Sequence, residues 1–139
     1  MRLSDEDRAT MVRLEMEKAH AFLRQAKLMF DQDLWDLAAN RFYYSCFHAV
    51  QALFIYNGLA SRRHAGLLSQ FGLYFIKTNV IEDRLGGFLT RMEQLRERAD
   101  YNCIYTVTKN EVEMMIEPAN ELISQIETLL QSPPTVETP

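Results

Sequence analysis

The residues best suited to chemistry lie in the stretch LRERADYNCIY, residues 95–105. Two arginines, an aspartate, two tyrosines and a cysteine fall within it. On a helical wheel of about 100° per residue, Arg96 falls in the apolar sector of its segment and Arg98 falls outside it. We therefore expect Arg96 to face protein and Arg98 to face solvent. The competing interpretation is a salt bridge, because Glu93 and Asp100 are within helical reach of Arg96, and an acid of the first helix could also pair with it.

A second polar set lies on an otherwise apolar segment. Arg41 and His48 are seven residues apart, which places them within about 20° of each other on a helix. Tyr44 and Gln51 lie nearby on the same wheel. Buried polar groups must be hydrogen-bonded or they destabilise the fold. One interpretation is hydrogen bonding between helices or at a dimer interface, and the other is a catalytic role for Arg41 and His48.

A third candidate is the basic turn SRRHAG, in which Arg62, Arg63 and His64 stand at the start of a predicted helix. Free N–H groups at a helix start point in one direction and favour an anion, so this turn could bind a phosphate. The alternative is an exposed basic turn without a ligand. His20, isolated on the first helix, is expected to be structural.

Several motifs that mark cofactor and metal enzymes are absent from the sequence. There is no GxGxxG, no phosphate-binding glycine loop, no HExxH, and no histidine–carboxylate set at metal-ligand spacing. No serine stands where a strand-to-helix elbow would place a nucleophile. We expect no cofactor and no metal, which leaves a metal-independent reaction or plain binding.

Composition narrows the class of protein further. The 139 residues are 47% hydrophobic and 24% charged, typical of one soluble domain. The net charge of -4 excludes a globally basic nucleic-acid surface, so RNA would need a local patch and DNA is not expected. Two cysteines without paired spacing indicate a reducing cytoplasm. No signal peptide or membrane span is visible.

Apolar spacing predicts five helices and no convincing strand, and so an all-α antiparallel bundle of four or five helices. Ser4 and the pair Thr108–Glu111 are predicted to cap the N-termini of two helices. Gly58 is predicted to end a helix at its C-terminus. Pro118 is predicted to kink the last helix rather than end it. Residues 1–131 form one domain in this interpretation, and the proline-rich residues 132–139 are expected to be disordered. The predicted helices cover residues 5–31, 34–56, 63–78, 82–99 and 108–131.

The second predicted helix, residues 34–56, is apolar and aromatic on almost every side. Such a helix is either central in its bundle or buried twice, once in the core and once against a partner. In a domain of this size the second arrangement is a serious alternative. We therefore expect the protein to form a homodimer.

Three stretches together resemble one family. They are AANRFYYSCFHAVQALFIYNGL, then RRHAGLLSQFGLYFIKTN, then LRERADY. This combination is similar to the small stand-alone HEPN domain proteins of bacteria and archaea, over about residues 34–130. The family pattern has R-x-Y-Y-x-x-F-H-A on the second helix and L-R-x-x-A-D-Y at the end of the fourth.

The resemblance implies a helical bundle that dimerises. It also implies kinship with metal-independent ribonucleases, often the toxin half of a toxin–antitoxin pair whose partner is a small nucleotidyltransferase-like protein. The family's active motif is an arginine followed by four to six residues and a histidine. In that chemistry a 2′-hydroxyl attacks the adjacent phosphate, the arginine stabilises the phosphorane and the histidine moves protons.

This sequence departs from that motif. After Arg96 the histidine positions hold Tyr101, Asn102 and Cys103, and an ordinary cysteine thiol is mostly protonated at neutral pH. The variant Arg-x4-His-x-Tyr aligns with Arg98, Cys103 and Tyr105. In that variant the tyrosine can be nucleotidylated by the partner enzyme, so Tyr105 is a candidate modification site. The wheel and the pattern L-R-x-x-A-D-Y both favour Arg96 as the motif arginine.

Three functional hypotheses follow. The first is a toxin-like HEPN dimer with a degenerate ribonuclease-type site, which binds RNA or a nucleotide through Arg96, Asp100, Tyr101 and the Arg41–His48 stripe. In this hypothesis either His48 takes the role of the missing histidine or no residue does. The hypothesis does not specify whether the protein cleaves RNA. The second is a non-catalytic adaptor that docks a nucleotidyltransferase-like partner. The third is a purely structural dimer.

Overall fold

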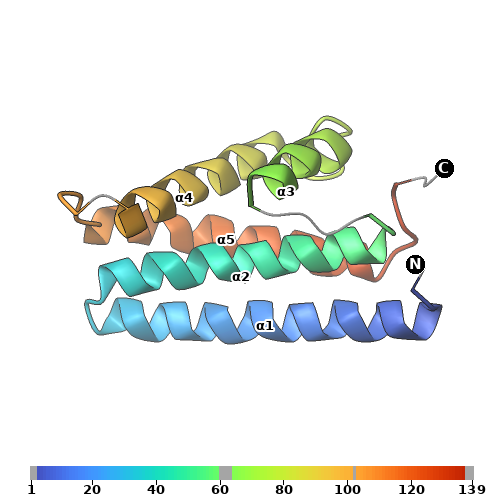
Figure 1. Cartoon of the computed structure of the whole chain (residues 1–139), viewed down its shortest axis with the longest axis horizontal. Helices are drawn as coiled ribbons and strands as arrows, with labels where there is room; N and C mark the ends of the chain where they lie inside the picture. Colours follow the sequence, from blue (N-terminus) through green and yellow to red (C-terminus); the bar gives the residue numbers. More distant parts are fainter. Residues whose placement is uncertain (1–2, 60–63, 102, 137–139) are drawn as a thin grey trace.

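The computed structural model describes residues 3–59, 64–101 and 103–136. Within these ranges there are helices and no strands, which confirms the all-α bundle. In Figure 1, α1 and α2 run side by side in opposite directions, α5 lies behind α2, and α3 and α4 lie along the other side. The elements are α1 (Asp5–Asp31), α2 (Trp35–Tyr56), α3 (His64–Phe71), the π-helical turn η1 (Gly72–Ile76), α4 (Asp83–Tyr101) and α5 (Lys109–Leu130).

Local signals in the sequence explain the helix ends. The hydroxyl of Ser4 accepts a hydrogen bond from the N–H of Asp7 at 3.0 Å, and so caps α1. Thr108 and Glu111 form the predicted capping box at the start of α5. Gly58, just past α2, has a φ of 71°, a backbone conformation that glycine adopts without steric cost. Helix α5 continues through Pro118, as expected.

The third predicted helix differs from the structure. The expected helix over residues 63–78 is divided into α3 and η1, where the N–H of Lys77 donates to the carbonyl of Gly72 at 2.9 Å. This five-residue hydrogen-bond spacing is that of a π-helix, which cannot be recognised from apolar periodicity. The helix then ends before Thr78, and Asn79 adopts a φ of 60° in the turn. The expected first residue, Arg63, lies outside the described residues.

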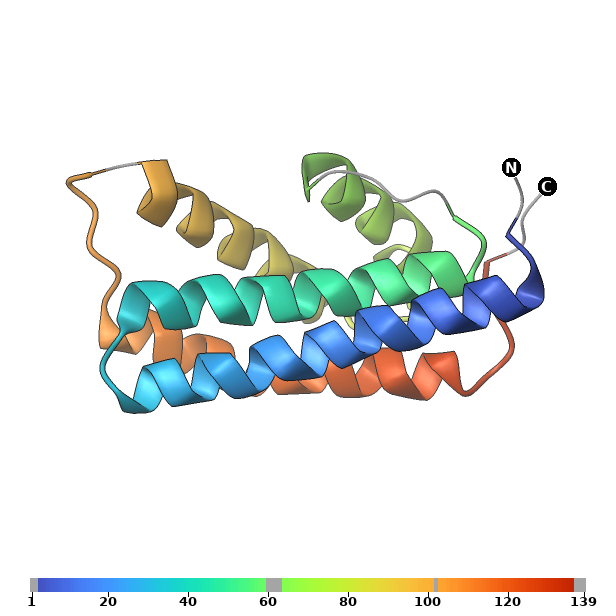
Figure 2. The ribbon, with the colours of Figure 1, turned by 60° about the horizontal axis from the view of Figure 1, so that its bottom comes forward.

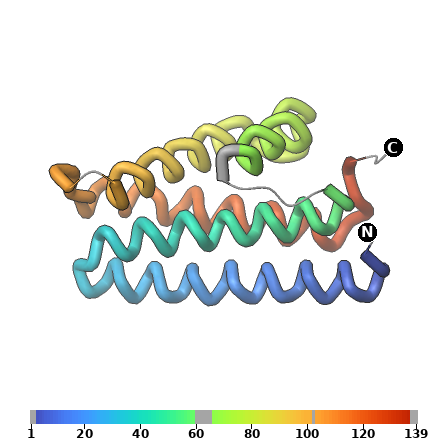
Figure 3. Tube along the Cα trace, in the orientation of Figure 1, coloured from blue at the N-terminus to red at the C-terminus, as the bar shows by residue number. Residues whose placement is uncertain are grey.

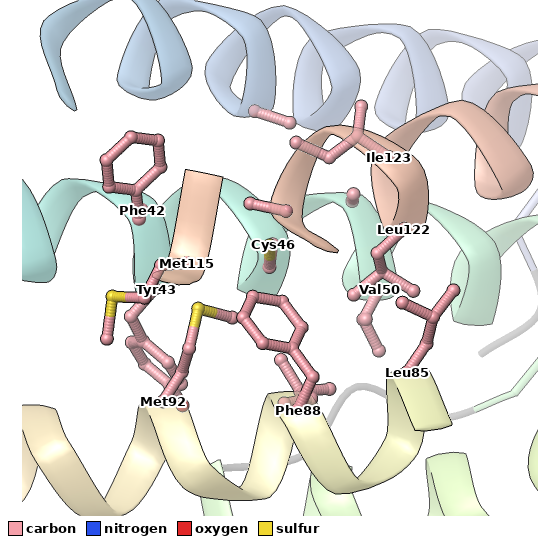
Figure 4. Packing of buried hydrophobic residues seen from close by; sticks show 14 of the residues in the cluster. Phe42, Tyr43, Cys46, Val50, Leu85, Phe88, Met92, Met115, Leu122 and Ile123 are labelled. Atoms are coloured by element: carbon pink, nitrogen blue, oxygen red, sulfur yellow. The ribbon is translucent and has the colours of Figure 1, made fainter. Parts of the chain in front are cut away.

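Helix α2 is the central element. Thirteen of its 22 residues are buried, and α1, α4 and α5 all pack against it. Figure 2 and Figure 3 show α2 running along the bundle between α1 and the layer that contains α4. Figure 4 shows the core from nearby, with Phe42, Cys46 and Val50 of α2 among side chains of α4 and α5. The central position accounts for most of the apolar surface of α2, and a dimer stays a prediction.

The C-terminal segment returns to the end of α2. The side-chain oxygen of Asn57 accepts hydrogen bonds from the N–H groups of Thr135 and Val136 at 3.0 and 3.1 Å, and Tyr56 donates to the carbonyl of Ser132. Residues 137–139 of the expected disordered tail lie outside the described ranges. Among the helices described, none is long and apolar enough to cross a membrane.

Candidate functional site

Arg96 lies on the face of α4 that packs against α2. It is 8% exposed, whereas Arg98, two residues on, is exposed. The guanidinium carbon of Arg96 lies 5.3 Å from the ring centre of Tyr43 and 5.8 Å from that of Tyr44. At these distances a guanidinium is attracted to an aromatic face. The difference in burial that the helical wheel predicted for the two arginines is confirmed.

Arg96 is also held by two carboxylates of its own helix. Its Nε and Nη2 atoms donate to the two carboxylate oxygens of Glu93, at 3.3 and 3.0 Å, and Nη1 donates to Asp100 at 2.9 Å. A two-point pair of this kind fixes the plane of the guanidinium as well as its position. The competing interpretation from the sequence, a salt bridge, is therefore present in the fold. Among the described residues, the acids that hold Arg96 come from α4, and none comes from α1.

Burial and charge act on this cluster in opposite ways. Burial disfavours the Arg96 cation, but the hydrogen bonds and charge of Glu93 outweigh burial and raise the pKa of Arg96 above its ordinary value. Burial, followed by a hydrogen bond to Glu93, raises the pKa of Tyr43 well above its usual range. In this cluster the guanidinium of Arg96 therefore stays charged and the phenol of Tyr43 stays neutral.

The cluster as it stands does not attract an anion. Two carboxylates outweigh one guanidinium by one negative charge, which opposes a phosphate group. The two acids differ in accessibility, since the side chain of Glu93 is 14% exposed and that of Asp100 is 41% exposed. Asp100 is therefore the partner that a ligand can displace, and doing so would free one edge of Arg96.

Tyr101 ends α4 and is 79% exposed. With Gln94, Glu97 and Arg98 it lines a hollow of about 500 Å³ on the surface. An exposed aromatic ring beside an arginine is a surface on which a nucleotide base can stack. Cys103 is exposed in the loop that follows, and Asn102 lies outside the described residues.

Tyr105 is tied to the start of α5. Its hydroxyl donates to the carboxylate of Glu111, and the guanidinium carbon of Arg98 lies 5.7 Å from its ring centre. Burial and the hydrogen bond to Glu111 raise the pKa of Tyr105 to about 12. Burial opposes ionisation of Glu111, but hydrogen bonds from Tyr105 and Thr108 outweigh it and lower the pKa of Glu111. The candidate modification site is thus a neutral phenol next to a carboxylate.

Arg41 and His48 meet on the seam between α1 and α2. The Nδ1 atom of His48 lies 2.6 Å from a carboxylate oxygen of Glu15, and Nε of Arg41 donates to Gln25 at 2.9 Å. The ring of Phe22 lies between them, 5.3 Å from the guanidinium carbon of Arg41 and 5.4 Å from the His48 ring. Of the predicted polar stripe, Arg41 and His48 contact polar side chains of α1, and Arg41 also donates to Asn40 of α2.

The two clusters are separate. Two aromatic residues of α2 stand between His48 and Arg96: Phe47 is 5.6 Å from His48, Tyr44 is 6.0 Å from Phe47, and Arg96 lies over Tyr44. Within one chain, no hydrogen bond of the described residues joins His48 to the Arg96 cluster. The described contacts of His48 are with Glu15, Phe22 and Phe47 and do not include Arg96.

The remaining candidates are placed as follows. Arg62 and Arg63 lie outside the described residues, and His64 is the first residue of α3. His20 pairs with Glu127 of α5, with Nε2 and Oε1 2.9 Å apart, which is a structural contact as expected. Across the described ranges, no group of three or more His, Cys, Asp or Glu side chains could hold a metal ion.

Sequence reasoning missed the residues that complete both clusters. It considered an acid of the first helix for Arg96, but Glu15 of that helix pairs with His48 instead. It also did not foresee the hydrogen bond between Tyr43 and Glu93. These contacts depend on how far one helix is shifted along its neighbour, for which a single sequence carries no signal.

Comparison with known families identifies the family to which the chain belongs. The sequence model of the HEPN domain matches residues 12–129. The chain is a member of the HEPN domain family. The HEPN resemblance inferred from residues 34–130 is therefore confirmed, and the match also covers α1 from residue 12 onward.

Curated HEPN relatives cover most of the chain. "Putative toxin MJ0605" of Methanocaldococcus jannaschii is 34% identical over 116 residues, which cover 84% of this chain and 86% of that protein. "Putative toxin MJ0142" of the same organism is 28% identical over 117 residues, covering 84% and 80%. "UPF0332 protein" of Thermotoga maritima is 32% identical over 114 residues, covering 82% and 86%. In this HEPN chain no histidine follows Arg96, which lies near the end of α4.

Proposed function

We propose that this HEPN protein is the toxin-like component of a toxin–antitoxin or defence module, and that it binds RNA or a nucleotide at the C-terminal end of α4. The observation that carries the proposal is the buried, aromatic-backed Arg96 whose outer partner, Asp100, is accessible. Tyr101, exposed one residue further on, supplies a stacking surface. Relatives named as toxins support the first part of the proposal.

Binding in this proposal proceeds by exchange of one anion for another. A phosphate takes the place of the Asp100 carboxylate on Nη1 of Arg96, while Glu93 continues to hold the other edge of the guanidinium. The aromatic faces of Tyr43 and Tyr44 keep the guanidinium in place during the exchange. RNA affinity should then depend on salt, because each neutralised phosphate releases counterions.

Cleavage is not part of the proposal, because no histidine follows Arg96 in the sequence. A missing general acid or base costs roughly 10²–10⁴ in rate. His48 is paired with Glu15 and separated from Arg96 by two aromatic rings. His48 of a second copy of the chain is one residue that would complete the motif. The variant His48→Ala tests this arrangement.

The proposed assembly is a homodimer that uses the face of α1 and α2. Glu15, the partner of His48, also lines a hollow of about 540 Å³ on α1. Met11 and Leu14 line the same hollow and are exposed. Light scattering on the purified chain should give twice the monomer mass, and Leu14→Glu should return it to one. A monomeric wild type at micromolar concentration would contradict this part of the proposal.

A second candidate function is a non-catalytic adaptor for a nucleotidyltransferase-like partner. Two observations favour it: the negative charge of the Arg96 cluster, and the Tyr105–Glu111 pair. In this alternative the Tyr105 oxygen attacks the α-phosphorus of a nucleoside triphosphate, pyrophosphate leaves, and Glu111 accepts the phenolic proton. Mass spectrometry after incubation with partner and nucleotide would show one added nucleotidyl group, which Tyr105→Phe removes.

One experiment separates binding, cleavage and docking. In the binding assay, labelled single-stranded RNA is titrated with wild type, Arg96→Lys, Tyr101→Ala and the surface control Arg24→Ala. In the cleavage assay, total RNA is incubated in EDTA with the same proteins and with His48→Ala. Binding about tenfold weaker in the first two variants and unchanged in Arg24→Ala supports the proposal. Cleavage that both Arg96→Lys and His48→Ala lose would establish a nuclease. Wild type that neither binds nor cleaves RNA contradicts the first proposal and leaves the adaptor.

A further inference from the structure

A groove between α4 and α5 lies next to the proposed binding surface and shares Gln94 and Arg98 with the hollow beside Tyr101. It has a volume of about 480 Å³. Met114 stands at its edge and is 77% exposed, an unusual position for a large apolar side chain. Figure 4 shows Met92 and Phe88 of α4 and Met115 of α5 pointing toward one another between the two helices. The apolar lining consists of Phe88, Met92, Leu95, Met114, Met115 and Pro118.

The chemistry of this lining suits a helix. Three of the six apolar side chains are methionines: Met114 is exposed at the edge, and Met92 and Met115 are buried at the base of the groove. Methionine is unbranched and polarisable, so it adapts to the side chains of a partner. A groove between two helices accepts the apolar stripe of an amphipathic helix, whose contacts recur at spacings of three, four and seven residues.

The rim of the groove carries positive charge along α4. Arg91 and Arg98 both line the groove and are seven residues apart, which is about 10 Å along a helix. Neither arginine forms an ion pair with the described residues, and Arg98 instead lies over the ring of Tyr105. Among the described residues, Glu111 is the one acid that lines the groove, and its carboxylate already accepts hydrogen bonds from Tyr105 and Thr108.

We propose that the α4–α5 groove binds an acidic amphipathic helix of a partner protein. The apolar stripe of that helix packs on the methionine-rich lining, and two carboxylates seven residues apart reach Arg91 and Arg98. An RNA strand fits less well, because six of the ten described lining residues are apolar and Gln94 is the one neutral polar side chain between the two arginines. The proposal does not depend on RNA binding at Arg96.

The test uses the full chain with its seven methionines labelled at the methyl carbon. Helical peptides are selected from a displayed random library against this protein, synthesised, and titrated while methyl NMR spectra are recorded. Met92, Met114 and Met115 report on the groove, and Met11 and Met16 report on the face of α1. Arg91→Gln/Arg98→Gln tests the charged rim, and Arg24→Gln is its control.

The expected result is a set of peptides with acids seven residues apart beside an apolar stripe. They should shift the methyl signals of Met92, Met114 and Met115 and bind at least tenfold more weakly to the double variant, with no change for Arg24→Gln. Selected peptides without acidic residues, shifts confined to Met11 and Met16, or no selected peptides would overturn the proposal. Groove signals that shift with protein concentration alone would assign the groove to a second copy and overturn it as well.

Discussion

Arg96 and Asp100 form an ion pair that is buried on one side and open on the other. Nη1 of Arg96 donates to the Asp100 carboxylate at 2.9 Å, with the guanidinium packed between helices and the carboxylate reaching solvent. The fold thus holds Arg96 in its charged form. The carboxylate of Asp100 occupies the position on the guanidinium where a phosphate would bind. Asp100 either competes with a ligand for Arg96 or serves only to stabilise α4.

Replacing Asp100 by Asn separates these two roles. The change removes one negative charge next to Arg96, and a unit charge at about 4 Å in water corresponds to about 1 kcal/mol. We expect Asp100→Asn to bind labelled single-stranded RNA about fivefold more tightly in a fluorescence anisotropy titration. Glu97→Gln, an acid beside the same surface hollow, is the matched control. Equal gains from both variants would show general charge repulsion and argue against Arg96 as the contact.

Arg96 should also be the largest single polar contributor to stability. Arg96→Met leaves the nearly buried Glu93 carboxylate without its cation, and breaking a buried ion pair costs about 3–5 kcal/mol. We expect this loss in urea denaturation, and a change within about 0.5 kcal/mol for the exposed Arg24→Ala. The double variant Arg96→Met/Glu93→Gln should lose less than Arg96→Met alone. A double variant less stable than either single variant would contradict this account.

The parts of the fold that were predicted correctly rest on local signals. The ends of α1, the Thr108 cap and the burial of Arg96 follow from residues within one or two helical turns. The division of the third helix at Gly72 was not predicted, because the apolar residues of so short a segment do not distinguish a π-helical turn from an α-helix. Helix caps and the burial of a side chain can be predicted from one sequence, whereas a small change in the number of residues per helical turn cannot.

The candidate site was predictable only in part, for a similar reason. The sequence indicated that Arg96 would be buried and that Glu93 and Asp100 were in reach, because all three share one helix. The pairing of His48 with Glu15 joins residues 33 apart on different helices. The separation of His48 from Arg96 by Tyr44 and Phe47 likewise depends on how α2 is rotated against α4. The contacts between helices could be identified only in the structure.

The Tyr105–Glu111 hydrogen bond should make stability depend on alkaline pH. The pKa of Tyr105 is raised from 10.0 to about 12, so the folded state holds the phenolic proton more tightly than the unfolded state does. This contribution is complete below pH 10 and is lost as pH rises toward 12. We expect Tyr105→Phe to be less stable than wild type at pH 8, with the difference shrinking in thermal melts between pH 10 and 12.

The exposed Tyr101 provides the control for the pH experiment. Tyr101→Phe should leave the pH dependence of the melting temperature unchanged. The same hydrogen bond lowers the pKa of Glu111, so its contribution is present above the ordinary carboxyl pKa of 4.5 and is lost as pH falls through the lowered value. A difference between wild type and Tyr105→Phe that stays constant from pH 8 to 12 would show that the bond contributes nothing to stability.

Two neighbouring glycines of α4 should respond to alanine in opposite ways. A β-carbon on Gly86 would lie 2.9 Å from Cγ1 of Ile76, whereas one on Gly87 would meet only the mobile end of Arg91 at 3.3 Å. Gly86→Ala should therefore force η1 away from α4 and destabilise the protein by about 1–3 kcal/mol. Gly87→Ala should stabilise it by up to about 1 kcal/mol, since alanine favours a helix more than glycine does. Urea denaturation of both variants tests the contact, and equal stabilisation by the two would show that α4 and η1 do not approach this closely.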